Sequence, residues 1–551
     1  MQTVGFNLCQ LLKRTDFYIF ANQDYMSRVR GGNNFFQLRI SQKPSQACRK
    51  LSDIIVTLDK QSVAIHGTNL SEGGILIMDS KKFNIAQEER YFDIPMYEMA
   101  LSLGSDLFVN SIVYGLISGI LGITNGNIFE VIKEAFSDKG EELISKNIAA
   151  AKAGIDYAKN NFKDERFFMT ARTGERTLLM NGNEAIALGA IRAGCKFYSG
   201  YPMTPSTSIM NEMAYHAKDF NIIVEQAEDE IAAINMVIGA SFAGVRAMTA
   251  TSGGGLSLMV EGLSLAAMTE TPAVIVDAQR PAPATGFPTR TEQADLNFVL
   301  YCGHGEFTRA VFTPGTIEEA YYLTIHAFNL AEKYQIPVLI MTDQYLADSY
   351  RNISELDRNA IKVKRFIISR EASKNITNYK RYELTDSGIS PRAIPSWIND
   401  VIYADSDEHN QEGHITEEAR VRESMVEKRL YKKMQGLEKE VIEPKSYNFE
   451  KATIVIIGFG STFGAIKEVS DASSGKIGFI HLPQVWPLPK KGLTDLLKSK
   501  QKVITVENNA SGQLAKLLHS EADIKIEKSI LKFDGRPFNA DDLIEEVNKL
   551  L

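Results

Sequence analysis

The chain has 551 residues, of which 44% are hydrophobic and 23% charged, and its formal net charge is −7. That length predicts three to four domains of roughly 150 residues each, and the composition is ordinary for a globular enzyme. The acidic balance argues against bulk nucleic-acid binding, which requires a basic surface. Every apolar run falls short of the roughly 18 residues that a membrane span needs, so we expect no membrane segment.

The cysteines and the N-terminus predict a cytoplasmic protein. The four cysteines are at positions 9, 48, 195 and 302, and none of them forms a CxxC pair. This argues against an iron–sulfur cluster or an all-cysteine zinc site built from this chain alone, and it fits a reducing compartment. The N-terminal stretch carries Lys13 and Arg14 and has no long apolar segment, so we do not expect a signal peptide.

Residues 1–165 are predicted to form an α/β domain. Strands are expected at FYIFA (Phe17–Ala21), after the glycine turn of RVRGGNNFFQLRIS (Arg28–Ser41), and at DIIVTLD and GGILIMD. The Ala- and Leu-rich stretch Met99–Leu121 predicts a helix. The chain begins inside a helix-like segment with no strand before it. A polar, charged linker is expected around Asn160–Arg176.

Residues 176–350 repeat a strand–loop–helix pattern, which predicts a doubly wound parallel sheet. The first helix of the block begins near Asn183, and Pro205 is expected in the first turn of a later helix, a position that proline favours. Ligands of such sheets bind at the carboxyl ends of the strands. The loops SGYPMTPS, TSGGGLSL and PATGFPTRTEQADL all follow predicted strands. We therefore expect the site in and around Ser199–Arg290.

Two further blocks follow this sheet. Residues 351–450 are polar, which predicts an extended connection and then one charged helix from about Glu417 to Glu438. Residues 451–551 again predict an α/β domain. Its turn GFGSTFG is GxGxxxG rather than GxGxxG, and the next strand does not end in an acid, so we set a dinucleotide site aside. His409 and His414 lack metal-ligand spacing and are expected in a solvated loop.

Glu230 is the first candidate catalytic residue. It lies at a helix start directly after the strand NIIVEQ, with Glu228 and Asp229 beside it. A carboxylate in this position can simply complement the helix dipole at the surface. Against that, Glu230 precedes a wholly apolar helix face, which predicts partial burial, and burial raises a carboxyl pKa and suits proton handling. From the residues alone, both interpretations stay open.

Three other loops carry candidate residues. Thr204 lies between two prolines, so its hydroxyl is either fixed for function or serves as a helix N-cap. The turn Ser252–Gly255 is either an anion-binding turn or a tight connection. Arg280 and Arg290 flank a loop rich in proline and glycine. A loop arginine can bind a carboxylate with two hydrogen bonds, although most loop arginines are merely solvated.

Several of these segments resemble one enzyme family. GNEAIALGAIRAGCKFYSGYPMTPSTSIM is similar to the start of the pyrimidine-binding domain in the α subunit of 2-oxoacid:ferredoxin oxidoreductases, where the family has a YPITP motif and this chain has Tyr201–Pro205. EQAEDEIAAINMVIGASFAG, TSGGGLSLMVEGLSLA, GFPTRTEQADL, GHGEFTR and YKRYELTDSGISPRA resemble further family segments in the family's order. The resemblance covers nearly the whole chain.

The flanking blocks resemble the family's other domains. NQDYMSRVRGGNNFFQLRIS is similar to the RGG segment of the family's γ domain, fused here ahead of the α part. The family's γ domain usually opens with a strand and a glycine-rich loop, whereas this chain starts just after that point, so any cofactor role of the loop is not carried over. The last block resembles a transketolase C-terminal-like domain.

The resemblance implies oxidative decarboxylation of a 2-oxoacid, with 2-oxoglutarate our preferred substrate. It implies thiamine diphosphate as cofactor, coenzyme A as acyl acceptor and ferredoxin as electron acceptor. The chain has no GDG motif and no cluster cysteines. A separate β subunit is therefore expected to carry the diphosphate site, its Mg²⁺ and a [4Fe–4S] cluster, in an αβ or (αβ)2 complex, and this explains a cofactor enzyme without a visible fingerprint.

The resemblance also implies residue roles. Glu230 is expected to hydrogen-bond the pyrimidine ring of the cofactor, Thr204 to approach cofactor and substrate, and Arg290 to pair with the 2-oxoacid carboxylate, with Arg280 in reserve. Further cofactor contacts are expected from Tyr201, Pro202, Ser252 and Gly253, and no metal ligand is expected on this chain. The alternative is a non-catalytic nucleotide-binding or assembly protein that retains the fold. The acid and the hydroxyl at the motif positions favour catalysis.

Overall fold

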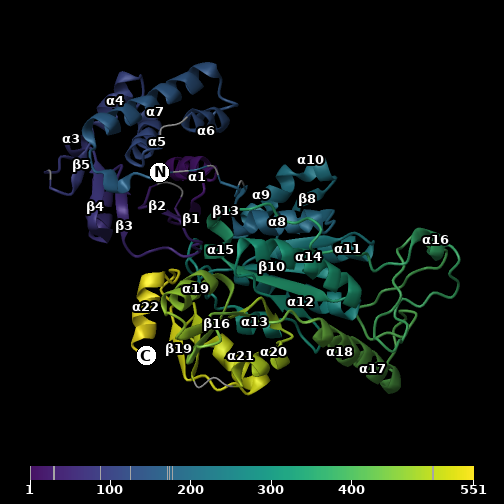
Figure 1. The fold of residues 1–551 in the computed structure, drawn as a ribbon. Coiled ribbons are helices and arrows are strands. Elements are labelled where there is room, and N and C mark those ends of the chain that lie inside the picture. The colour runs from purple at the N-terminus through teal and green to yellow at the C-terminus, as the bar shows by residue number, and fades with distance from the viewer. Residues whose placement is uncertain are drawn as a thin grey trace. The chain divides into compact units, whose positions relative to one another are not determined.

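The structure is a computed structural model that describes residues 2–28, 31–86, 88–123, 126–170, 172, 174–176, 178–498 and 502–550. The chain folds into two compact units. The first comprises Met1–Met180, Ser349–Glu355 and Asn539–Glu545, and the second comprises Asn181–Asp348, Leu356–Phe538 and Glu546–Leu551. Each unit is described by itself (Figure 1).

The first unit contains two sheets. One is antiparallel, with strand order β2-β1-β13-β6, and the other is parallel, with order β3-β4-β5. The strands are β1 (Tyr18–Asp24), β2 (Phe35–Ser41), β3 (Ser52–Val56), β4 (Leu70–Met78), β5 (Tyr91–Asp93), β6 (Leu178–Met180) and β13 (Tyr350–Ile353). The predicted strands are confirmed. In the predicted glycine turn ahead of β2, residues 29 and 30 lie outside the described residues.

Helices complete the α/β character of the first unit. They are α1 (Gln2–Leu12), α2 (Lys60–His66), α3 (Ser80–Phe83), α4 (Met96–Ser102), α5 (Val109–Ile120), α6 (Asn127–Ala135) and α7 (Glu141–Asn161), and α22 (Ala540–Asn548) begins here. The prediction of one helix over Met99–Leu121 is wrong, because Gly104 has a positive φ and Ser105 caps a new turn that leads into α5. Helices α5 and α7 cross at Gly115 and Gly154, where any Cβ would meet the other backbone.

The second unit is built on a seven-stranded sheet with order β17-β11-β12-β10-β9-β7-β8. All neighbouring pairs are parallel except β11 with β17. The strands are β7 (Phe197–Gly200), β8 (Ile223–Gln226), β9 (Ala247–Thr251), β10 (Ala273–Gln279), β11 (Ala310–Phe312), β12 (Pro337–Asp343) and β17 (Gln484–Trp486). The predicted doubly wound parallel sheet is confirmed.

Helices cover both faces of this sheet (Figure 1), as right-handed crossovers require. They are α8 (Gly182–Arg192), α9 (Thr207–Tyr215), α10 (Ala217–Phe220), α11 (Glu230–Phe242), α12 (Gly253–Met268), α13 (Leu296–Tyr301), α14 (Ile317–Tyr334) and α15 (Gln344–Asp348). Pro205 does not lie in a first helical turn as predicted. Ser206 donates its backbone N–H and its hydroxyl to the carbonyl of Met203, so Pro205 lies in a separate turn before α9.

The second unit continues into a five-stranded sheet with order β14-β16-β15-β18-β19. Its elements are β14 (Lys445–Tyr447), β15 (Ile454–Phe459), β16 (Ile477–Leu482), β18 (Lys502–Glu507), β19 (Lys528–Leu531), α19 (Phe463–Ala472), α20 (Lys490–Leu497) and α21 (Gln513–Ala522). We call residues 445–538 the last subdomain. Its strands share one apolar core with α11, α12 and α13, so burial of this core stabilises both sheets together.

The connection ahead of β14 has little regular structure apart from α16 (Arg370–Ser373) and one long helical run. That run comprises α17 (Ala419–Val426), a π-helical segment Glu427–Lys432, and α18 (Lys433–Leu437), so the predicted charged helix is confirmed. Two of its lysines, Lys428 and Lys433, are fully buried against Glu270.

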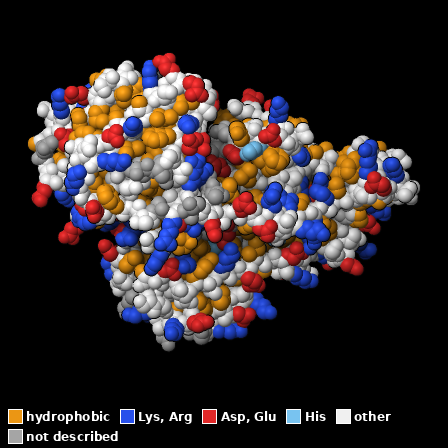
Figure 2. Space-filling view, turned by 45° about the horizontal axis from the view of Figure 1, so that its top comes forward, with side chains coloured by type: hydrophobic (Ala, Val, Ile, Leu, Met, Phe, Trp, Pro, Cys, Tyr) orange, Lys and Arg blue, Asp and Glu red, His pale blue; other side chains and the backbone are white. Residues whose placement is uncertain are grey.

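The visible surface carries charges of both signs. Figure 2 shows lysine, arginine, aspartate and glutamate side chains interspersed with hydrophobic ones. Many exposed charges form short-range pairs, such as Lys146 with Glu142 at 2.7 Å, and such pairs contribute only about 0–1 kcal/mol each. Among the described helices, none combines the length and the apolar character that crossing a bilayer requires.

Candidate active site

The candidate site lies where the strand order of the seven-stranded sheet reverses. From β7 the chain first adds β8 on one side and then returns to add β9 on the other. In open α/β sheets, the crevice at the carboxyl ends of the strands next to such a switch point is where ligands bind. The loop Tyr201–Ser206 follows β7, and Ser252 follows β9. Two of the predicted loops therefore meet at the expected position.

Glu230 is the first residue of α11, and its side chain is buried. Asp229 caps the helix by accepting a hydrogen bond from the backbone N–H of Ala232 at 2.7 Å, so Glu230 is not needed as the cap. Glu230 is only 3% exposed, and its Oε1 has no hydrogen-bond partner among the described residues. A Cβ at Gly255 would lie 2.6 Å from that oxygen, so only glycine leaves room for this carboxyl.

The first turn of α12 is the second part of the site. Ser252 is buried, and its hydroxyl has no hydrogen-bond partner among the described residues. A Cβ at Gly253 would lie 2.5 Å from Oδ2 of Asp295, which is likewise buried without a partner in the described part of the chain. Buried polar atoms normally have partners, so those that lack them mark a place where a ligand is expected.

Two buried aspartates near the first turn of α12, Asp277 and Asp295, were not predicted from the sequence. Asp277 is fully buried in β10, and neither of its carboxyl oxygens has a partner among the described residues. Burial, with Asp295 adding to it, holds the pKa of Asp277 well above its usual range. Burial also raises the pKa of Asp295 to about 6, against the opposing charge of Arg280. The only signal in the sequence is an acid inside the apolar run AVIVDAQ.

The structure brings Thr204 and Arg280 together. Nη1 of Arg280 donates to the backbone carbonyl of Thr204 at 2.6 Å. Burial lowers the pKa of Arg280, and the charge of Asp295 partly offsets this. Thr204 is not a helix N-cap, because Ser206 occupies that position ahead of α9.

The other predicted residues take different places. Arg290 is half-buried, its backbone N–H donates to the carbonyl of Phe287 at 3.1 Å, and its Cβ lies near Gly535 of the last subdomain. Tyr201 is 42% exposed and Pro202 is half-buried at the start of the loop that carries Thr204. The site therefore groups around Glu230, Ser252 and Arg280.

Three family models match the chain in sequence order. They describe "Pyruvate ferredoxin/flavodoxin oxidoreductase" over residues 1–157, "Pyruvate flavodoxin/ferredoxin oxidoreductase, thiamine diP-bdg" over residues 188–428, and "Pyruvate:ferredoxin oxidoreductase core domain II" over residues 452–543. The alpha subunit of a 2-oxoacid:ferredoxin oxidoreductase from Sulfolobus sp is 34% identical, covering 97% of this chain and 92% of that protein. This chain belongs to the family of 2-oxoacid:ferredoxin oxidoreductase alpha subunits. The predicted resemblance is confirmed.

Other members of the family are similar in sequence and structure. The 2-oxoglutarate synthase subunit KorA from Methanothermobacter marburgensis is 32% identical over 67% of this chain and 97% of its own length. A structure of 2-oxoglutarate:ferredoxin oxidoreductase from Magnetococcus marinus, with 2-oxoglutarate, coenzyme A and succinyl-CoA bound, superposes with a TM-score of 0.92 at 30% identity. That superposition covers 99% of this chain and 96% of the other. In this alpha subunit, Glu230, Ser252 and Arg280 all fall inside the matched thiamine diphosphate-binding domain.

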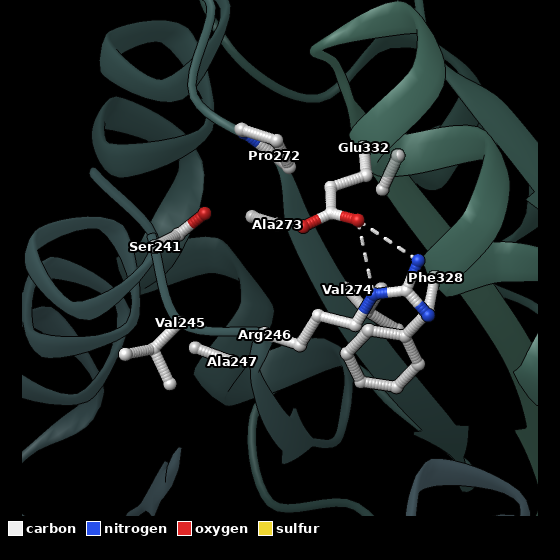
Figure 3. Close-up of a pocket in the computed structure, with 10 residues that line it drawn as sticks. Ser241, Val245, Arg246, Ala247, Pro272, Ala273, Val274, Phe328 and Glu332 are labelled. Atoms are coloured by element: carbon white, nitrogen blue, oxygen red, sulfur yellow. Dashed lines mark hydrogen bonds and ion pairs between the residues drawn. The ribbon is translucent and has the colours of Figure 1, made fainter. Parts of the chain in front are cut away.

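A small cavity lies beside Arg246 and Glu332, away from the candidate site. Arg246 and Glu332 line it, and their side chains are joined by hydrogen bonds at its wall (Figure 3). Arg246 donates to Oε2 of Glu332 at 2.9 Å and also to the carbonyl of Ala193. The cavity lies at the amino ends of β9 and β10, whereas sheets of this kind bind ligands at the carboxyl ends. It is therefore not the candidate site.

Two motifs that were set aside have structural roles. Gly460 of GFGSTFG has a positive φ, and a Cβ there would lie 2.7 Å from Nε2 of Gln293, so this glycine accommodates a side chain. The prediction that His409 is solvated is wrong. Its ring is fully buried against Tyr382, with centroids 4.0 Å apart, because the chain folds back on itself between His409 and Ile415. His414 is exposed as predicted.

Proposed function

We propose that this alpha subunit, with a separate β subunit, oxidatively decarboxylates a 2-oxoacid to the acyl-CoA and passes the electrons to ferredoxin in the cytoplasm. The proposed preferred substrate is 2-oxoglutarate, supported by the likeness to the KorA subunits and to the Magnetococcus marinus enzyme. Coenzyme A as acceptor is supported by the ligands bound in the latter structure. The observation that carries the proposal is the buried carboxyl of Glu230, inside the thiamine diphosphate-binding domain, whose Oε1 has no partner among the described residues.

The residues present fit the cofactor that this domain implies. Thiamine diphosphate, when bound, supplies the chemistry that stabilises negative charge at the former 2-oxo carbon. Glu230 would form a hydrogen bond with the ring nitrogen of the aminopyrimidine, because its carboxyl is buried and its Oε1 has no partner among the described residues. Ser252 and Gly253 at the start of α12, and Tyr201 and Pro202 in the facing loop, would line the same half-site.

Two arginines are proposed for the substrate. The hydrogen bond from Arg280 to the carbonyl of Thr204 puts a guanidinium next to the residue expected to approach the reacting carbon, so Arg280 now joins Arg290 as a full candidate. An arginine holds a carboxylate through two parallel hydrogen bonds, and a lysine cannot reproduce this geometry. A dicarboxylic substrate such as 2-oxoglutarate would use both arginines.

A β subunit is proposed to complete the site and to supply the Mg²⁺ and a [4Fe–4S] cluster. Helices α11 and α12 carry apolar residues on their outward faces as well as on their core faces, a pattern typical of helices that a partner covers. One face packs into the core, while Ile231, Met236 and Leu258 on the other are 41–49% exposed. Because Glu230 begins α11, a partner that covers this face would also reach the half-site.

The cysteines of this chain support the division of labour. All four are free and buried, and burial raises the pKa of the Cys195 thiol to about 12. A cluster ligand must be a thiolate, which such an environment disfavours. Within the part of the chain that the structure describes, no three potential metal ligands come together.

The proposed function is tested by producing the chain alone and together with its partner subunit. We expect the lone chain to be colourless and free of iron, and the complex to be brown and active. Activity is measured as reduction of ferredoxin on a panel of 2-oxoacids with coenzyme A, and 2-oxoglutarate is expected to give the highest kcat/KM. Stoichiometric iron in the lone chain would refute the proposed division of labour. Absence of turnover on every 2-oxoacid would refute the proposed activity.

A further inference from the structure

The loop Thr291–Asp295 is held by the last subdomain through hydrogen bonds centred on Gln293. The backbone N–H of Gln293 donates to the carbonyl of Asn508 at 2.6 Å, and the N–H of Asn508 donates back to Oε1 of Gln293 at 3.2 Å. Asn509 donates from Nδ2 to the carbonyl of Gln293 at 3.2 Å. The turn after β18 therefore forms hydrogen bonds with both the backbone and the side chain of Gln293.

Gln513 fixes the same loop from a second direction. Its Nε2 donates to the carbonyl of Ala294 at 2.7 Å, and its Oε1 accepts from the backbone N–H of Asn297 at 2.8 Å. Nε2 of Gln293 donates to the carbonyl of Phe459 at 2.9 Å. The motif VENNASGQ, which the substrate and cofactor assignments leave without a role, thus serves to hold one loop in place.

The loop delivers one carboxyl to the half-site. The backbone N–H of Asp295 donates to Oε1 of Gln279 at 3.1 Å, and Gln279 is itself anchored on the carbonyl of Thr342. The Asp295 side chain then lies against Gly253, at the first turn of α12. It is 9% exposed, and its Oδ2 has no hydrogen-bond partner among the described residues.

The charges around Asp295 do not explain its burial. Asp277 on β10 and Glu292 on the same loop are both acidic, and among the described residues the one opposing charge that acts on Asp295 is that of Arg280. A buried carboxyl among acids costs stability, so an ordinary structural role would be filled better by asparagine. Costly buried groups that the surroundings hold firmly in place are typical of functional sites.

We call Asn508, Asn509 and Gln513, which hydrogen-bond the loop at Gln293, Ala294 and Asn297, the clamp. We propose that Asp295 is a positioning residue for the reaction. The clamp holds its loop, and the Asp295 carboxyl acts on Arg280 through its charge and on the first turn of α12 through its place against Gly253, which keeps both in their working positions. The last subdomain thereby sets the geometry of a half-site that lies in another sheet. This inference rests on the proposed function, because it assigns Arg280 and Gly253 the roles proposed above.

The test compares Asp295→Asn with the wild type in the complex with the partner subunit. We expect kcat on 2-oxoglutarate to fall about 100-fold, since a displacement of about 1 Å at a reacting centre has that effect. The wild-type kcat should change with pH near 6, where Asp295 titrates, and this inflection should be absent from the variant. Glu292→Gln, which removes a neighbouring acid from the same loop, should change kcat by less than threefold.

The clamp is tested by a matched pair of glutamines. Gln513→Glu puts an oxygen opposite the carbonyl of Ala294 and should lower kcat per folded molecule about 10-fold. Gln484→Glu is the control, because Gln484 is also buried in the last subdomain and hydrogen-bonds Pro487 and Ile442 rather than the loop. Equal losses in both variants would overturn the clamp.

Thermal melting, which does not depend on turnover, tests the role of Asp295 independently of the proposed function. Because the folded-state pKa of Asp295 is raised, the wild type loses stability as the pH rises through about 6. Asp295→Asn should therefore melt at a higher temperature than the wild type at pH 8, with the gap closing below pH 4. An active wild-type complex with an equally active Asp295→Asn variant would overturn the inference alone, whereas an inactive wild type would overturn the proposed function.

Discussion

The buried charged groups at the two ends of helix α12 have opposite surroundings. At its start, the carboxyls of Glu230 and Asp295 and the hydroxyl of Ser252 are buried with oxygen atoms that have no partner among the described residues. Just past its end, Glu270 is fully buried but is surrounded by cations. Helix α12 therefore separates a site whose oxygen atoms lack partners among the described residues from a buried carboxylate, that of Glu270, which is held by ion pairs.

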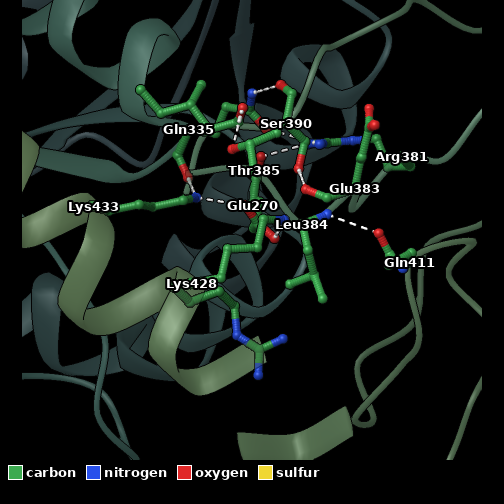
Figure 4. A network of polar contacts seen from close by, with 12 residues as sticks. Glu270, Gln335, Arg381, Glu383, Leu384, Thr385, Ser390, Gln411, Lys428 and Lys433 are labelled. Carbon is green, nitrogen blue, oxygen red and sulfur yellow. Dashed lines mark hydrogen bonds and ion pairs between the residues drawn. The ribbon is translucent and has the colours of Figure 1, made fainter. Parts of the chain in front are cut away.

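We call Glu270, Lys428, Lys433 and Arg381 the Glu270 anchor (Figure 4). Its ion pairs connect the helical run α17–α18 to the segment between α12 and β10. Lys428 and Lys433 reach the carboxylate of Glu270 at 2.5 and 2.6 Å, and Arg381 donates to its backbone carbonyl at 2.6 Å. Burial alone would raise the pKa of Glu270, but the three cations hold it well below its usual range.

One carboxylate cannot fully compensate three cations. Burial lowers the pKa of Lys428 to about 8 although Glu270 opposes this, so pairing dominates for the acid and burial dominates for the lysine. The anchor is nevertheless closed to solvent on all sides. The comparison shows that burial of a charged group does not by itself indicate a functional site. A buried carboxyl that is paired with cations has a structural role, whereas one whose oxygen atoms lack partners indicates a ligand-binding site.

The largest expected effect is at the open end of α12. Glu230→Gln keeps the size and one hydrogen bond but removes the carboxyl group, so we expect the complex to assemble and kcat to fall by about two to four orders of magnitude. Thermal stability should not decrease, because no hydrogen bond in the described structure depends on Oε1. Steady-state kinetics and a melting curve on the same preparation check both parts.

Glu228→Gln is the matched control for that change. Glu228 lies in the turn before α11 and its side chain is exposed, whereas Glu230 is buried. We expect less than a threefold change in kcat. Equal losses in the two variants would reduce the acidic cluster to a feature of a helix end.

The largest expected stability effect is at the closed end. Glu270→Gln leaves Lys428, Lys433 and Arg381 buried without a carboxylate, and removal of one partner from a buried pair costs about 3–5 kcal/mol. Turnover per folded molecule should be unchanged. Denaturant unfolding measures the loss, and Glu261→Gln on the exposed face of α12 is the control. A stable but inactive Glu270→Gln variant would contradict the division between the two ends.

Much of this comparison could be predicted from the sequence at the open end. Strand alternation and glycine turns placed the loops after β7 and β9, and the apolar face of α11 indicated that Glu230 is buried. Asp277 and Asp295 could not be assigned, because an acid in an apolar run does not reveal whether a cation faces it. That depends on which elements pack against it, which is long-range information.

The closed end was beyond sequence reasoning for the same reason. Lys428 and Lys433 lie in a run of charges that is typical of a solvated helix face, yet both are buried. Their partner Glu270 precedes them by more than 150 residues, so no local sequence pattern indicates that the two segments are in contact. His409 was misjudged in the same connection, because its burial also depends on a distant partner, Tyr382.

The two arginines of the open end should give intermediate effects. Arg280→Lys should raise KM for 2-oxoglutarate about 10- to 100-fold, because a lysine cannot form the paired hydrogen bonds with a carboxylate. Arg290→Lys should raise KM for 2-oxoglutarate and for pyruvate alike, because both carry the 2-oxoacid carboxylate that Arg290 is proposed to bind. Thiamine diphosphate affinity serves as the control and should stay constant. Unchanged KM values in both variants would remove the arginines from the substrate site.

The smallest effect is expected for one cation of the Glu270 anchor. Lys428→Met keeps the length of the side chain, and Lys433 and Arg381 continue to compensate Glu270, so we expect a loss of about 1–2 kcal/mol at pH 7. The sign of its pH dependence follows from the lowered pKa. Between pH 8 and 10.5 the folded wild type binds fewer protons at Lys428 than the unfolded chain does, so the stability that this lysine contributes rises with pH. The gap between wild type and Lys428→Met should therefore widen across that range, measured by denaturant unfolding, while the exposed Lys439→Met control shows no such trend. A gap that narrows with rising pH would mean that pairing, not burial, governs Lys428, and that the anchor is more fully compensated than its one carboxylate suggests.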